Sequence, residues 1–106
     1  MTRTDTLSKA NEIVNGARQG AYGTPEDNFT RIAQFWTAYT GVPLYAEDVA
    51  NMMILLKVAR ASSGVYCEDN YVDIAGYAAC GGEIAGAKDT KAKVTEALKK
   101  YTNGER

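Results

Sequence analysis

The chain has 106 residues, of which 45% are hydrophobic and 24% are charged. This is the composition of an ordinary globular domain, and it excludes a largely disordered chain. Twelve basic and thirteen acidic side chains give a net charge of −1, so the strongly basic footprint of a nucleic-acid-binding protein is not visible overall.

The first helix is expected to begin near Thr6 or Ser8, since either hydroxyl can cap it, and to end at Gly20. Its apolar residues recur at the helical period and are Leu7, Ala10, Ile13, Val14 and Ala17. A second helix is predicted over about 25–40. Thr24 suits its N-cap, Pro25 its first position and Gly41 its end.

A third helix is predicted over about 45–62. Its centre, 49–58, is apolar nearly all round, which is typical of a central, buried helix. A fourth helix is predicted over about 67–87, where four glycines indicate close helix packing or a kink near 81–82. After a junction at 88–90, with Asp89 as a candidate cap, a last helix is expected over about 90–102.

No useful strand alternation, internal repeat or low-complexity tract appears. We therefore predict an all-α bundle of four or five helices in one domain, 1–106, with residues 1–4 and 103–106 disordered. A core this small, carrying aromatic and Gly/Ala-rich helices, favours a homo-oligomer. No run of about 18 apolar residues occurs and no signal peptide opens the chain, so we expect a cytoplasmic protein and no membrane partner.

Carboxylates among apolar side chains point to a site between the third and fourth helices. Histidine is absent, so a bound metal would be a hard cation held by oxygen, such as Mg²⁺. The predicted metal ligands are Asp48, Asp69 and Asp73, and Asp73 and Asp69 are also the candidate catalytic residues. Asp73 is the strongest candidate because it lies in mid-helix between Val72 and Ile74. The simpler alternative is that the acids at helix starts only complement the helix dipole.

Basic and polar residues nearby are candidates for holding a ligand. Lys57 and Arg60 suit phosphate groups, while Asn70 and Tyr77 share a helix face with Asp73. The loop before the second helix and the N-terminal end of that helix add three further candidates, which are Arg18, Tyr22 and Asn28. A tight turn between helices is the competing interpretation of that loop, and Glu26 and Asp27 would repel an anion there.

The cysteines and the largest apolar side chains are expected to be structural. Cys67 and Cys80 belong to no CxxC motif and are expected to be buried free thiols. The side chains of Trp36, Met52 and Met53 are expected in the core.

Two stretches, YGTPEDNFTRIAQFWTAYTG and DVANMMILLKVARASSGVYCEDNYVDIAGYAA, resemble a family of small phage and prophage proteins. The second stretch is also similar, more distantly, to all-α nucleotide pyrophosphohydrolases of the MazG type. Those enzymes hold Mg²⁺ with E-x-x-E and E-x-x-D motifs on successive helices. The matching positions are Asp48-x-x-Asn51 and Asn70-x-x-Asp73, where one acid of each pair is asparagine.

The resemblance implies a MazG-like helical protein that binds a nucleotide or a nucleotide-like phosphorylated ligand. It leaves three functions open. The first is Mg²⁺-dependent hydrolysis of a nucleoside triphosphate, with metal-bound water as nucleophile. The second is sequestration of a nucleotide without cleavage, which a phage could use against host defence. The third is a helical protein-interaction module.

Overall fold

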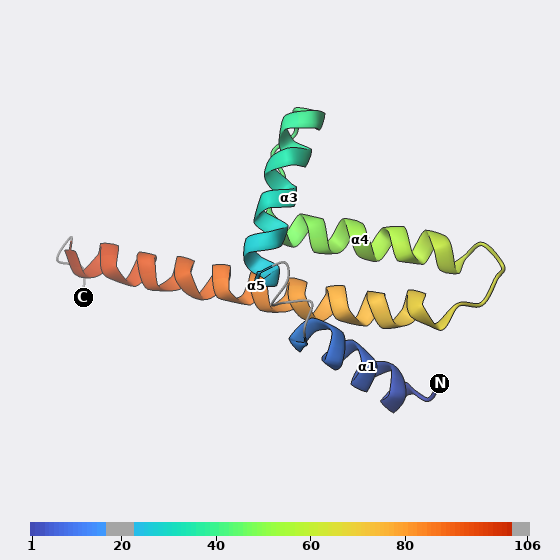
Figure 1. Ribbon diagram of the computed structural model, residues 1–106. Coiled ribbons are helices and arrows are strands. Elements are labelled where there is room, and N and C mark those ends of the chain that lie inside the picture. The colour runs from blue at the N-terminus through green and yellow to red at the C-terminus, as the bar shows by residue number, and fades with distance from the viewer. Residues whose placement is uncertain (17–22, 103–106) are drawn as a thin grey trace.

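The computed structural model describes residues 1–16 and 23–102. Over these residues the chain is helical and has no strand, which confirms the all-α class. The helices are α1 (Arg3–Asn15), α3 (Pro25–Thr40), α4 (Ala46–Ala61) and α5 (Glu68–Thr102), as shown in Figure 1. Within these ranges, no helix has the length and apolar character needed to cross a membrane.

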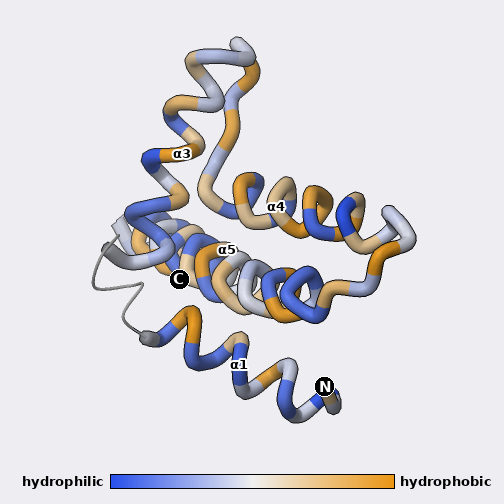
Figure 2. The backbone as a smooth tube through the Cα atoms, turned by 45° about the vertical axis from the view of Figure 1, so that its right-hand side comes forward, coloured by the Kyte–Doolittle hydropathy of each residue, from blue (hydrophilic) through white to orange (hydrophobic). Residues whose placement is uncertain are grey.

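The long helix α5 is the axis of the molecule. α4 runs back along it as the other arm of a hairpin, and α1 packs on the opposite side of α5 (Figures 1 and 2). α3 stands across the start of α4, and the C-terminal part of α5 projects beyond the other helices (Figure 1). The resulting body measures 60 × 35 × 27 Å.

α1 begins earlier than its sequence suggests. The Thr2 hydroxyl accepts a hydrogen bond from the Asp5 amide at 3.1 Å, and the Asp5 carboxylate accepts one from the Thr2 amide at 3.0 Å. This reciprocal cap starts the helix at Arg3, so the predicted start at Thr6 or Ser8 is wrong. α1 ends at Asn15, and the rest of the predicted helix, beyond Gly16, lies outside the described residues.

α3 has the predicted bounds, and its caps explain them. The Thr24 hydroxyl accepts from the Asp27 amide at 3.2 Å, and Pro25 occupies the first turn, where its missing N–H costs nothing. Gly41 ends the helix in the left-handed region at φ 74°, with its amide donating to the Thr37 carbonyl. The predicted third helix is likewise confirmed as α4.

The predicted fourth and fifth helices form the single helix α5, so the predicted junction at 88–90 is wrong. Asp89 does not cap a new helix, because it forms an ion pair of 3.1 Å with Lys93 one turn later. The Thr90 hydroxyl donates to the Gly86 carbonyl within the same helix. Both polar side chains therefore find their interaction partners within the same helix, and the helix continues through 88–90.

The core lies where α3, α4 and the middle of α5 meet. Its buried members are Phe29, Ala33, Ala46, Val49, Ala50, Cys80 and Ile84. Trp36 and Met53 are half-buried against this cluster, whereas Met52 is 41% exposed and Cys67 is also exposed. The predictions of a buried Met52 and a buried Cys67 are therefore wrong.

α4 is an edge helix and not the central, buried helix that its composition indicates. Only Ala46, Val49 and Ala50 of this helix are buried. Apolar residues on its far side remain open to solvent, and Leu55 is 66% exposed. The prediction of a central α4 fails because α5 covers one side of it and no described helix covers the side away from α5 (Figures 1 and 2).

Candidate functional site

A pocket of about 230 Å³ lies between the four helices. Most of its wall is apolar, and the residues that line it are Ala10, Ile13, Val14, Gly23, Pro25, Asn28, Phe29, Ile32, Val49, Met53, Val72, Asp73, Gly76, Tyr77 and Cys80. Its polar side chains are an amide, a carboxylate and a phenol, contributed by Asn28, Asp73 and Tyr77. An apolar hollow with a few convergent polar groups is the usual form of a small-molecule site.

The carboxylate of the pocket is held by a basic partner. Lys57 Nζ of α4 lies 2.7 Å from Asp73 Oδ2 of α5, and these side chains are 13% and 26% exposed. The pair links the two arms of the hairpin at this level. It also balances the charge that Asp73 brings to an otherwise apolar wall.

An aromatic pair forms another part of the wall. The rings of Phe29 and Tyr77 have centroids 6.0 Å apart and are tilted by 36°, a favourable arrangement for two aromatic side chains. Gly76 lies one residue before Tyr77, and a Cβ added there would lie 3.3 Å from Val14 Cγ1. The small residue at position 76 therefore lets α1 approach α5 closely beside the pocket.

Three of the predicted site residues come together in this region with Asp73. Asn28 and Tyr77 line the pocket with Asp73, and Lys57 contacts Asp73 directly. Asn70 is buried at 8% exposure but does not line the pocket. Asp69 and Arg60 are exposed and lie outside the lining. Arg18 and Tyr22 are outside the described residues.

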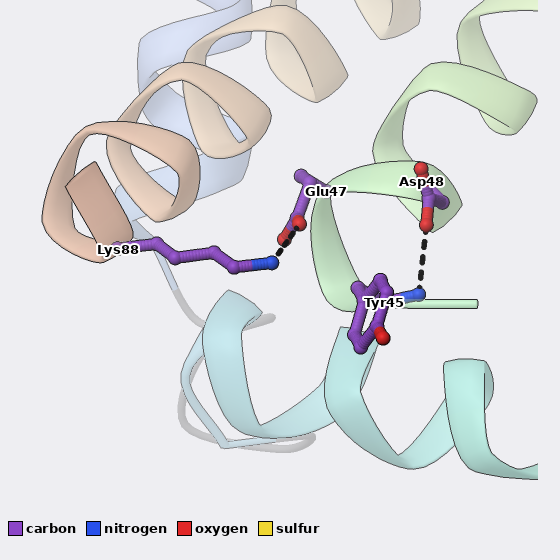
Figure 3. Close-up of polar contacts among 4 residues, drawn as sticks. All are labelled: Tyr45, Glu47, Asp48 and Lys88. Carbon is purple, nitrogen blue, oxygen red and sulfur yellow. Dashed lines mark hydrogen bonds and ion pairs between the residues drawn. The ribbon is translucent and has the colours of Figure 1, made fainter. Parts of the chain in front are cut away.

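Asp48 lies in the first turn of α4 (Figure 3), at the end of the hairpin away from the Lys57–Asp73 pair. Its carboxylate accepts a hydrogen bond of 2.9 Å from the Tyr45 backbone amide, which caps the start of α4. Asp48 precedes Lys57 by nine residues on α4, a rise of about 14 Å, whereas Asp73 lies level with Lys57. Asp48 and Asp73 are therefore far apart along the hairpin.

This register bears on the predicted magnesium site. Over the described part of the chain, no three acidic or thiol side chains gather in a group that could hold a metal ion. Asn51, the partner of Asp48 in the matching motif, is exposed. The prediction that Asp48, Asp69 and Asp73 share one Mg²⁺ gains no support from this arrangement.

A second polar cluster joins the start of α4 to the middle of α5 (Figure 3). Lys88 Nζ lies 2.7 Å from Glu47 Oε1 and 4.3 Å from the centre of the Tyr45 ring. The hydrogen bond from Lys88 lowers the pKa of Glu47, and the same bond raises the pKa of Lys88. This cluster links α4 to α5 at the start of α4, and the Lys57–Asp73 pair links the same two helices near the end of α4.

Sequence reasoning missed some of the residues that form these sites. Phe29 lies within the predicted second helix, but nothing local in the sequence reveals that its ring meets Tyr77 at the pocket. The sequence predicts a junction between helices at Lys88, so it does not reveal the ion pair of Lys88 with Glu47. A signal is present for Lys88, since the sequence from 87 to 102 contains no glycine or proline that would end the helix.

Comparisons with known proteins place the chain among phage proteins. It is 53% identical to the Gene 55 protein of Mycobacterium phage L5 over 73 residues, covering 68% of this chain and 47% of the relative. It is 40% identical to the Gene 55 protein of Mycobacterium phage D29 over 74 residues, covering 70% of this chain and 49% of the relative. The matched region thus spans about half the length of these relatives.

These matches agree with the resemblance to small phage proteins, and none of them is a MazG-type enzyme. No solved structure matches the chain significantly. The family described as "Domain of unknown function (DUF6378)" matches residues 5–85, which include most of α1, all of α3 and α4, and the first half of α5. The chain therefore belongs to the DUF6378 family.

Proposed function

We propose that this protein binds a small ligand of the nucleoside or nucleotide class and holds its heterocyclic base in the pocket beside Asp73. The observation that carries the proposal is the composition of that pocket. It combines aromatic and aliphatic walls with one carboxylate, one amide and one phenol.

Each of these groups suits a nucleobase. The faces of a base favour aromatic neighbours such as Phe29 and Tyr77. The Asp73 carboxylate accepts hydrogen bonds from the amino and imino groups on a base edge. The Asn28 amide both donates and accepts, so it can pair with either kind of atom on that edge.

The size of the pocket limits which part of a nucleotide it holds. Its volume of about 230 Å³ is below the range of about 300–1,000 Å³ for sites that enclose a whole drug-sized ligand. None of the described residues that line the pocket is basic, and Lys57 is already paired with Asp73. The base would therefore be enclosed, while the sugar and any phosphates would extend toward the pocket mouth.

Binding without cleavage is the form of this function that the described residues support best. Hydrolysis of the MazG type needs several carboxylates around Mg²⁺, and the described part of the chain gathers no such group. A phage could use a protein of this kind to sequester a nucleotide. The alternative is a MazG-like enzyme with metal held by Asp48, Asp69 and Asp73. It predicts that Asp69→Asn abolishes hydrolysis.

The test is a thermal-shift and calorimetric screen of nucleobases, nucleosides and ribo- and deoxynucleotides, with and without Mg²⁺, and with pyrophosphate release followed in parallel. We expect heat stabilisation by at least one of these ligands and none by inorganic triphosphate. Asp73→Asn should abolish that stabilisation, because the changed side chain lies in the pocket. Asp69→Asn is the matched control and should bind normally, because Asp69 is exposed outside the pocket.

Two results would contradict the proposal. Binding that survives Asp73→Asn would place the ligand elsewhere. Pyrophosphate release that needs Mg²⁺ and disappears in Asp69→Asn would establish the metal-dependent enzyme instead.

A further inference from the structure

The outer face of α4 carries an apolar stripe that no described helix covers. Its members follow the helical spacing i, i+3, i+4, i+7 and are Met52, Leu55, Leu56 and Ala59. Leu55 is 66% exposed, Met52 41% and Leu56 40%. In Figures 1 and 2, α5 lies along the other side of α4, and α1 lies beyond α5.

The chain as a whole exposes more surface than a compact monomer of its mass. Its accessible surface is 7762 Å², whereas a monomer of 11.5 kDa exposes about 5,800 Å². The excess of about 2,000 Å² is larger than the roughly 800 Å² that each partner buries in a standard protein interface. The radius of gyration, 17.2 Å, likewise exceeds the value of about 13 Å for a compact chain of this length.

The charge pattern indicates which partner fits the α4 stripe. Between Val49 and Ala59 the only charged residue is Lys57, and that side chain points to Asp73 of α5 and is 13% exposed. The stripe itself carries no charge. Two identical copies can therefore face each other there without like-charge repulsion.

The exposed stripe near the end of α5 differs in this respect. Val94 and Leu98 are 53% and 60% exposed, but lysines surround them at positions 91, 93, 99 and 100. Pairing that segment with its own copy would bring like charges together. The self-complementary surface is thus the one on α4.

We propose that the α4 stripe binds the α4 stripe of a second copy, with the two helices antiparallel about a twofold axis near Leu55 and Leu56. Leu55 of one copy then packs on Leu56 of the other, and Met52 packs toward Ala59. The two α4 helices then lie at the centre of the assembly, and each α5 lies on the outer side of its own α4. No residue of the stripe lines the pocket beside Asp73, so this assembly does not depend on the proposed ligand.

The test compares two substitutions of equal chemistry and similar exposure. Leu55→Glu places a carboxylate at the proposed axis, and Leu98→Glu places one on the α5 stripe. Mass is measured by light scattering after size exclusion and by sedimentation equilibrium, with circular dichroism to follow helix content. We expect the wild type and Leu98→Glu to be dimers, and Leu55→Glu to raise the dimer dissociation constant about 30-fold or more.

A mixing experiment covers the case in which Leu55→Glu loses structure with its partner. Leu55→Glu and Leu55→Lys are co-expressed with different tags, because opposite charges at the axis should restore pairing. Recovery of a mixed dimer supports the α4 interface. Any one of four results would overturn the proposal. These are a monomeric wild type, a dimer that persists in Leu55→Glu, dissociation by Leu98→Glu alone, and failure of the mixed pair to form.

Discussion

Lys57 and Asp73 join the two arms of the α4–α5 hairpin through an ion pair of 2.7 Å. Their side chains are 13% and 26% exposed, so solvent screens the pair less than it screens a surface pair. Removing one partner leaves the other charge half-buried without its counter-ion. The interaction therefore lies between the small effect of surface ion pairs and the large effect of buried ones.

The first prediction is a double-mutant cycle at this pair. Lys57→Met and Asp73→Asn should each lower the free energy of unfolding by about 1–2 kcal/mol. The double variant should lose less than the two singles together, because neither charge is then left alone. Urea denaturation followed by circular dichroism measures all four proteins. Strict additivity would show that the two side chains do not interact in solution.

The second prediction concerns the close approach of α4 and α5 at Gly81. A Cβ added at Gly81 would lie 2.9 Å from the Cβ of Ala50, whereas one added at Gly82 would meet nothing within 4 Å. Gly82→Ala should raise the free energy of unfolding by up to about 1 kcal/mol, because alanine favours the helix. Gly81→Ala should lower it by about 1–3 kcal/mol, because the hairpin must open to admit the methyl group.

Adding Ala50→Gly to Gly81→Ala tests the cause of that loss. It removes the atom that the new methyl group would strike, so the double variant should be more stable than the sum of the single effects predicts. Equal stabilities for Gly81→Ala and Gly82→Ala would mean that the helices do not approach closely at this level.

The third prediction separates the two thiols. Cys67 is exposed and Cys80 is buried, and burial raises the pKa of the Cys80 thiol above its usual value. Since the thiolate is the reactive form, a thiol reagent at pH 8 should modify Cys67 rapidly and Cys80 only slowly. Mass spectrometry of the labelled peptides measures each rate, and Cys67→Ser serves as the control. Comparable rates at both positions would contradict the buried placement of Cys80.

The helix boundaries that could be predicted are those set by local chemistry. Thr24, Pro25 and Gly41 act within one turn of the helix that they begin or end, so the sequence displays them directly. The role of Asp89 is ambiguous from the sequence, because aspartate suits both an N-cap and a mid-helix ion pair. Only its partner Lys93 decides between the two roles.

The position of α4 could not be predicted, for a different reason. Apolar residues on every side of a helix show that it avoids water, but not which surface covers each side. Here α5 covers one side, and the stripe that contains Leu55 remains open within a single chain. The proposed second copy reconciles that composition with the edge position.

The candidate site was predicted in part. Asp73 stood out as a carboxylate in an apolar run, and the structure places it in the pocket with Asn28 and Tyr77. Whether Asp73 lies near Asp48 depends on the register of α4 against α5, that is, on which residues of the two helices lie side by side. That register follows from contacts such as Gly81 with Ala50, which no local pattern reveals.

The last prediction concerns the acid stability of the Glu47–Lys88 pair. The hydrogen bond from Lys88 lowers the folded-state pKa of Glu47 below its ordinary value of 4.5. A lowered folded pKa means that the pair stabilises the fold fully above pH 4.5 and loses that contribution as pH falls through the folded value. Glu47→Gln should therefore melt at a lower temperature than the wild type at pH 7, with the difference closing progressively below pH 4.5.

Thermal melts at several pH values measure this difference, and Glu96→Gln is the matched control because Glu96 is an exposed glutamate elsewhere on α5. The control should follow the wild type across the whole range. Added salt should reduce the difference in melting temperature between Glu47→Gln and the wild type at pH 7, because both members of the pair contact solvent and their attraction is screened. A gap that stays constant down to pH 3 would mean that the glutamine acts through packing, and that the charge of Glu47 contributes nothing to the hairpin.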